Sequence, residues 1–137
     1  IVIATSLLML PISFSMADSK TVENLLQNYT AQGAAAPNAE QGKRLWQKTF
    51  TGKGDFPERS CSSCHTDDLT ALGKHVKTNK AIEPMTPSAN PERLTDSKKV
   101  EKWFKRNCKW TLGRECSAQE KSDLLFYINN PISFRSQ

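Results

Sequence analysis

Cysteine and histidine are scarce in this sequence, with four cysteines and two histidines among 137 residues. Cys61 and Cys64 are spaced as C-x-x-C, whereas Cys108 and Cys116 are too far apart to form a second pair of that kind. A structural zinc site needs four ligands, usually arranged as two such clusters. The scarcity therefore argues against zinc and leaves each cysteine pair to be explained separately.

Patterns of β-structure and internal repeats are also missing. No segment of useful length alternates apolar and polar residues, and hydrophobic residues make up only 37% of the chain. Apolar residues recur instead at helical spacing, as in Val22, Leu25, Leu26 and Tyr29. We therefore predict an all-α fold.

A long run without charge occurs only at the N-terminus, over residues 1–17. It ends in the small residues Ser15 and Ala17, which is typical of a secretory signal sequence, here with its start missing and cleavage expected after Ala17. The run is shorter than the roughly twenty apolar residues of a membrane-spanning helix, and Pro11 interrupts it, so an uncleaved anchor is the alternative. We predict export, to the periplasm in a Gram-negative cell.

Residues 61–65 read Cys-Ser-Ser-Cys-His, which is the C-x-x-C-H attachment site of c-type haem. Two thiols at this spacing can add to the two vinyl groups of one porphyrin, and the adjacent imidazole then reaches the iron axially. The alternative is a thioredoxin-like redox dithiol. We predict one covalent haem c held by Cys61, Cys64 and His65, which would also give a small domain a large apolar centre.

Helix signals before this motif define the first part of the chain. The apolar stripe from Val22 to Tyr29 predicts a helix that ends near Gly33. Asn38, with Gln41 three residues later, predicts the start of a second helix. We therefore divide the chain into a signal sequence over 1–17, a helix and linker over 18–37, and one cytochrome domain over 38–137.

Two more helices are predicted after the motif. Thr95 is a candidate N-cap for a helix over residues 96–107, followed by a loop that carries both remaining cysteines. Ser117 and Glu120 have the spacing of a capping box, and the last helix should stop before Pro131.

Basic residues are concentrated between Lys98 and Arg114, where seven basic residues accompany one acidic residue in a chain of formal net charge +5. Such a concentration could suggest nucleic acid. We predict no nucleic acid partner, because an exported haem protein rarely meets one. The region is then either a solvated helix face or a patch that attracts an acidic redox partner.

The residues leave open which side chain takes the second axial position on iron. His75 stands in a polar stretch and is most simply a solvated side chain. Met85 offers a soft thioether that favours Fe(II), or it packs against the porphyrin. Asn107 offers a hard, weak amide oxygen that Fe(III) tolerates better than Fe(II), or it ends a helix. Asn107 lies closer to the last helix than Met85 does.

The chain resembles class I c-type cytochromes over about residues 38–130. In that family an N-terminal helix with a glycine and an aromatic residue crosses the C-terminal helix, as Gly42 and Trp46 would cross residues 124–128 here. A narrower resemblance comes from TNKAIEPMTPSANPERLTDSKKVEKWFKRNC followed by TLGREC. This run is similar to the sphaeroides haem protein family, which are monohaem cytochromes c that bind oxygen and nitric oxide.

The narrower resemblance implies that Asn107 binds the oxidised iron and leaves when the iron is reduced. It also implies a disulfide between Cys108 and Cys116, whose nine-residue ring would contribute roughly 2.6 kcal/mol and hold the neighbouring Asn107 near the iron. The alternative is that the bridge only stabilises a small exported domain. The alternative function is a simple electron-transfer cytochrome with Met85 on the iron.

The resemblance further implies partners. The expected ligands of Fe(II) are O2, NO and CO, and the expected electron donor is a dihaem cytochrome c, itself fed by a membrane cytochrome b. Oxidation of nitric oxide to nitrate, a dioxygenase-type reaction, is compatible with this chemistry. The sequence shows no general base for it, although oxygen chemistry at haem can proceed with little help beyond pocket polarity.

Overall fold

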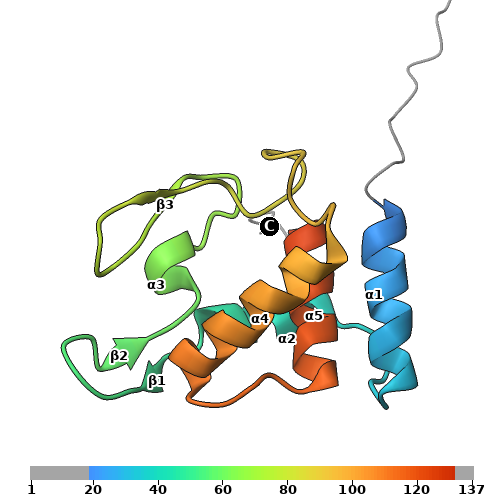
Figure 1. Cartoon of the computed structure of the whole chain (residues 1–137), viewed down its shortest axis with the longest axis horizontal. Coiled ribbons are helices and arrows are strands. Elements are labelled where there is room, and N and C mark those ends of the chain that lie inside the picture. The colour runs from blue at the N-terminus through green and yellow to red at the C-terminus, as the bar shows by residue number, and fades with distance from the viewer. Residues whose placement is uncertain (1–18, 132–137) are drawn as a thin grey trace, which may run out of the picture.

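The structure is a computed structural model that describes residues 19–131 of the chain. Within this range the helices are α1 (Ser19–Ala31), α2 (Ala39–Gln47), α3 (Ser62–His65), α4 (Ser97–Leu112) and α5 (Ala118–Asn129). Figure 1 shows α1, α4 and α5 grouped together and α3 at the other side of α4. The all-α prediction is confirmed. The predicted signal sequence lies outside the described residues.

The crossing of α2 and α5 is the closest helix contact in the fold. Asn38 caps α2 by accepting a hydrogen bond from the Gln41 amide at 3.0 Å, as predicted. A Cβ atom on Gly42 would lie 2.1 Å from the carbonyl oxygen of Asp123 on α5, so only glycine permits this approach. The Asp123 carboxylate also accepts a hydrogen bond from the Asn38 amide at 2.7 Å. The start of α2 is therefore fixed directly to α5.

Helix α1 packs along α5 through the predicted apolar stripe. Val22, Leu25 and Tyr29 are buried, and Leu26 is partly buried against the same core. Figure 1 shows α1 beside α5, with the two helices running in opposite directions. Gly33 follows with a φ of +97°, a conformation that glycine adopts readily and that ends the helix. None of the helices within residues 19–131 has the length and apolarity that crossing a bilayer requires.

The structure corrects both ends of the predicted fourth helix. Asp96, and not Thr95, is its N-cap, because the Asp96 carboxylate accepts from the Lys99 amide at 3.1 Å. The Thr95 hydroxyl instead donates to the carbonyl of Glu92. The helix also continues past Asn107 to Leu112 and ends at Gly113, which has a φ of +75°. No helix-breaking residue precedes Gly113, so the predicted loop is helical over its first half.

The last helix agrees closely with its prediction. The Ser117 hydroxyl accepts from the Glu120 amide, and the Glu120 carboxylate accepts from the Ser117 amide, which completes the capping box. Arg114 makes two hydrogen bonds of 2.7 Å to the same carboxylate. This interaction holds the pKa of Glu120 below its usual value.

Two short β-ribbons lie before and after α3. They were not predicted from the sequence. Strand β1 (Phe50–Thr51) pairs with β2 (Glu58–Arg59), and β3 (Gly73–Lys74) pairs with β4 (Ala81–Ile82), both antiparallel. Each strand has two residues, too few to show an alternating pattern. The ribbons matter because they place residues 59 and 73 next to the haem motif.

Candidate haem site

The two cysteines of the motif lie on a single tight turn. Cys61 precedes α3 and Cys64 lies within it, and both are free thiols. The Ser60 hydroxyl lies 2.9 Å from the hydroxyls of Ser62 and Ser63. These hydrogen bonds fix the turn at the start of the motif. Burial raises the pKa of the Cys61 thiol to about 12.

His65 is partly buried and uncharged. Its pKa is lowered to about 4, first by burial and then by the positive charges of Arg93 and His75. Among the described residues, its buried Nδ1 atom has no hydrogen-bond partner. The ring lies 5.5 Å from the ring of Trp46, whose indole N–H donates to the Thr66 carbonyl at 2.9 Å. A neutral imidazole is the form that binds iron.

The chain after the motif packs tightly against it. A Cβ atom on Gly73 would lie 2.3 Å from the carbonyl oxygen of Cys64 and 3.0 Å from the Cα atom of His65. Strand β3 can therefore approach α3 only because residue 73 is glycine. Two reduced thiols and a neutral imidazole on one turn form the donor set that a covalently bound haem requires. Within the described residues, no group of His, Cys, Asp and Glu could hold a bare metal ion.

Met85 lies in a loop attached to the segment that follows His65. Its amide donates to the carbonyl of Leu69 at 2.9 Å. The Arg93 guanidinium donates to the carbonyls of Glu83 and Pro84, each at 2.8 Å. The same guanidinium is close enough to lower the pKa of His65. These contacts place the Met85 loop with the part of the fold that surrounds His65.

The sequence predicts Asn107 at the end of its helix, but the residue lies within α4, and its side chain is exposed. It shares one face of the helix with Trp103 and Trp110, which are four residues before it and three residues after it. The Arg59 guanidinium stacks on the Trp110 ring at 4.6 Å and donates to the Trp110 carbonyl at 2.9 Å. Because Arg59 comes two residues before Cys61, this contact joins the C-terminal half of α4 to the start of the haem motif.

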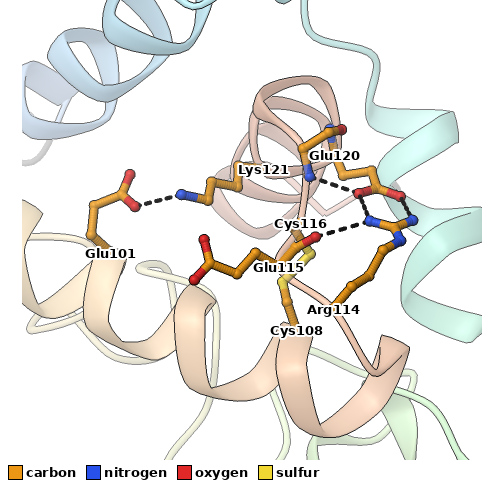
Figure 2. The surroundings of a disulfide bond; sticks show 8 residues. Glu101, Cys108, Arg114, Glu115, Cys116, Glu120 and Lys121 are labelled. Carbon is orange, nitrogen blue, oxygen red and sulfur yellow. Dashed lines mark hydrogen bonds and ion pairs between the residues drawn. A yellow bond between two sulfur atoms is a disulfide. The ribbon is translucent and has the colours of Figure 1, made fainter.

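The residue after Asn107 forms the predicted disulfide. Cys108 and Cys116 are bonded, with their Cα atoms 5.5 Å apart, and both are buried. Figure 2 shows the bridge between the end of α4 and the start of α5. At the surface, Lys109 of α4 forms an ion pair of 3.4 Å with Glu115, the residue before Cys116.

Three residues that contact this region were missed by sequence reasoning: Gly73, Arg93 and Arg59. Gly73 stands in a polar stretch and has no turn signal beside it. The two arginines contact backbone carbonyl groups and an aromatic ring that come close to them only when the chain folds. No local sequence pattern predicts such contacts. His75, by contrast, accepts from the amides of Lys77 and Thr78 at 3.3 Å each, which supports the turn between β3 and β4.

The chain is similar to known proteins. Residues 32–128 match a family described as a domain of unknown function, DUF1924. The cytochrome c-type protein SHP of Cereibacter sphaeroides is 43% identical over 115 residues, which cover 83% of this chain and 87% of SHP. Cytochrome c'' of Methylophilus methylotrophus is 36% identical over 121 residues, which cover 83% of each chain.

Solved structures of both relatives have the same fold. Oxidised SHP, described as an oxygen-binding cytochrome c, matches with a TM-score of 0.72 and 44% identity, over 79% of this chain and 95% of SHP. Oxidised cytochrome c'' matches with a TM-score of 0.73 and 32% identity, over 83% of this chain and 97% of cytochrome c''. The chain therefore belongs to the DUF1924 family and is a small class I c-type cytochrome with one covalently bound haem.

Proposed function

We propose that this protein is a periplasmic cytochrome that accepts an electron and, once reduced, binds oxygen at an iron position that Asn107 blocks in the oxidised state. Cys61 and Cys64 would hold the haem through two thioether bonds, and His65 would bind its iron. The haem would supply a redox-active iron that can take a further ligand. The rest of the proposed mechanism depends on the protein side chains around the haem.

Asn107 carries the redox dependence. Its amide oxygen is a hard, neutral and weak ligand, which binds Fe(III) better than Fe(II). Reduction would therefore weaken its interaction with the iron and release the side chain. The relatives support this: SHP is described as oxygen binding, and a solution structure of cytochrome c'', with a TM-score of 0.70 and 32% identity, is described as giving insight into haem-ligand detachment.

The observation that carries the proposal is the position of Asn107 beside the Cys108–Cys116 bridge. Asn107 also shares a helix face with Trp110, whose carbonyl accepts a hydrogen bond from Arg59, two residues before Cys61. A weak ligand keeps its place only if its backbone is held, and the bridge holds the adjacent residue. Met85 is the less favourable candidate. Its loop is attached to the segment around His65, whereas a second iron ligand would have to come from a different part of the fold.

Asn107→Ala tests the proposal directly. In the oxidised wild type we expect a six-coordinate iron, and in the variant a high-spin iron in both redox states, because alanine offers no ligand. Absorption and electron paramagnetic resonance spectra of the ferric and ferrous protein measure this change. Carbon monoxide should bind both ferrous proteins.

Met85→Ala is the matched control, and it should leave the ferric spectrum unchanged. If Met85→Ala instead removes a thioether absorption band, the simple electron-transfer function is correct. A ferrous wild type that stays low-spin and does not bind carbon monoxide would also contradict the proposal.

The remaining parts of the proposal concern location and partners. A disulfide in the described domain fits an oxidising compartment such as the periplasm. We propose a dihaem cytochrome c as electron donor, with a membrane cytochrome b before it, and NO and CO as further ligands of the reduced protein. Anaerobic titration with each gas, followed by absorption spectroscopy, tests the ligands.

A further inference from the structure

We infer that Tyr29, Glu101 and Lys121 form a clamp that positions α4 so that Asn107 can reach the iron. The inference rests on the proposed role of Asn107 and extends it to three residues that do not touch the haem site. Tyr29 comes from α1, Glu101 from α4 and Lys121 from α5. The clamp therefore joins three helices at one point.

Burial alone holds α4 weakly. Of its sixteen residues only Cys108 and Thr111 are buried, and Trp103 is 41% exposed. Val100 and Phe104 are partly buried against the core. A helix with so little buried surface takes its position from a few specific tethers, and each of them can be removed by mutation.

One group of tethers holds the C-terminal half of α4. The disulfide ties Cys108 to Cys116 at the start of α5, and Arg59 holds Trp110. These contacts fix the helix on one side of Asn107 only. A second attachment is needed to set the direction of the helix axis.

The clamp supplies that second attachment. The Tyr29 hydroxyl donates to Glu101 Oε1 at 2.5 Å, and Lys121 Nζ donates to Glu101 Oε2 at 2.7 Å. The same Nζ atom lies 5.7 Å from the centre of the Tyr29 ring. Figure 2 shows the bond from Lys121 on α5 to Glu101 on α4, close to the disulfide. Both carboxylate oxygens of Glu101 are thus occupied.

Two of the three clamp residues are sheltered from water, which strengthens their hydrogen bonds to Glu101. Tyr29 is fully buried and the Lys121 side chain is only 18% exposed, whereas the Glu101 side chain is 39% exposed. Burial, followed by the hydrogen bond to Glu101, raises the pKa of Tyr29 well above its ordinary value. Tyr29 therefore remains a hydrogen-bond donor at every physiological pH.

The spacing of the two attachments, the clamp at Glu101 and the disulfide at Cys108, explains how the clamp affects the position of Asn107. Glu101 and Cys108 are seven residues apart, nearly two helical turns, so both attachments act on the same face about 10 Å apart. Asn107 lies between them and projects from a different face. Without the clamp, α4 can pivot about the disulfide, and Asn107 moves with it. Tyr29 and Lys121 are positioning residues for this ligand.

The test uses full-length, haem-loaded Tyr29→Phe and Lys121→Met in the oxidised state. Each removes one bond to Glu101 and keeps most of the side-chain volume. We expect a larger high-spin fraction and imidazole binding to ferric iron that is about fivefold faster or more, a modest coupling between distant sites. Electron paramagnetic resonance and stopped-flow absorption measure the two quantities. Lys121→Arg keeps the ion pair and should behave as the wild type.

Gln119→Ala is the matched control. Gln119 accepts a hydrogen bond from the Ala35 amide at 2.7 Å and donates one to Asp123 at 2.9 Å, so its loss weakens the attachment of α5 without touching α4. Its ferric spectrum should not change. Amide hydrogen exchange gives a readout that does not depend on the iron: exchange within α4 should accelerate in Tyr29→Phe and not in Gln119→Ala.

The outcomes separate this inference from the proposed function. If Asn107→Ala alters the ferric spectrum while Tyr29→Phe and Lys121→Met do not, the clamp is overturned and the ligand assignment stands. If one clamp variant does not fold, the other decides. If Asn107→Ala itself leaves the ferric spectrum unchanged, the proposed function fails, and the clamp fails with it.

Discussion

At the scale of single residues, Gly42 shows how one missing side chain sets the fold around the site. An added Cβ would lie 2.1 Å from the Asp123 carbonyl oxygen and 2.8 Å from the Tyr127 Cβ atom. The first of these is a backbone atom that cannot rotate away. We therefore predict that Gly42→Ala lowers the free energy of unfolding by about 1–3 kcal/mol or more. Denaturant titration of the ferric haem protein measures this change.

Gly113→Ala provides the comparison. A Cβ there would meet no atom within 4 Å, and the cost comes only from its φ of +75°. We expect a loss of about 1–2 kcal/mol. If Gly42→Ala were as stable as the wild type, α2 and α5 would have to separate without cost, and the packing described above would be wrong.

At the scale of elements, the Cys108–Cys116 bridge joins α4 to α5. Replacing both cysteines with alanine opens the nine-residue ring, and we predict that the free energy of unfolding falls by about 2.6 kcal/mol. The same variant should show a larger high-spin ferric fraction, because residue 107 is no longer held. Denaturant titration and ferric spectra of one sample measure both effects.

Lys109→Ala is the control at this scale, since it removes only the ion pair with Glu115, in which both side chains are more than half exposed. Such a pair contributes less than about 1 kcal/mol. A double alanine variant with unchanged spectra but reduced stability would show that the bridge only staples the domain. The alternative that the sequence left open would then be the correct one.

At the scale of the whole molecule, a row of lysines lies on one face of α4. Lys98, Lys102, Lys105 and Lys109 follow one another at helical spacing, in a chain of net charge +5. We predict that reduction by ascorbate, an anion, slows as ionic strength rises, and that reduction by hexaammineruthenium(II), a cation, accelerates. Replacing Lys98 and Lys102 together by Glu should weaken both trends. Stopped-flow absorption measures the rates.

The control for the charge prediction replaces Lys74 and Lys80, on the β3–β4 ribbon, by Glu. This pair changes the net charge by the same amount at a different place. Equal effects of the two pairs would mean that net charge alone steers the reductant. A larger effect of the α4 pair would support a docking patch for an acidic donor.

Features that depend on neighbouring residues were predictable from the sequence. The Cys61–His65 motif, the Asn38 cap and the Ser117–Glu120 capping box each lie within five positions, so their chemistry is complete in a short peptide. The end of α4 was predicted wrongly because Asn107 and Cys108 resemble a helix end locally, whereas the helix runs on to Gly113. The short ribbons escaped prediction because two residues carry no periodicity.

The sequence by itself determined the cofactor and the fold class, because covalent attachment and helix periodicity are properties of local spacing. Only the tertiary structure decided which elements hold those residues in place. Tyr29 meets Glu101 across 72 positions, and Arg59 meets Trp110 across 51. Such contacts form only when helices pack together through their apolar faces. The sequence of one segment therefore does not show which partner its polar groups will contact.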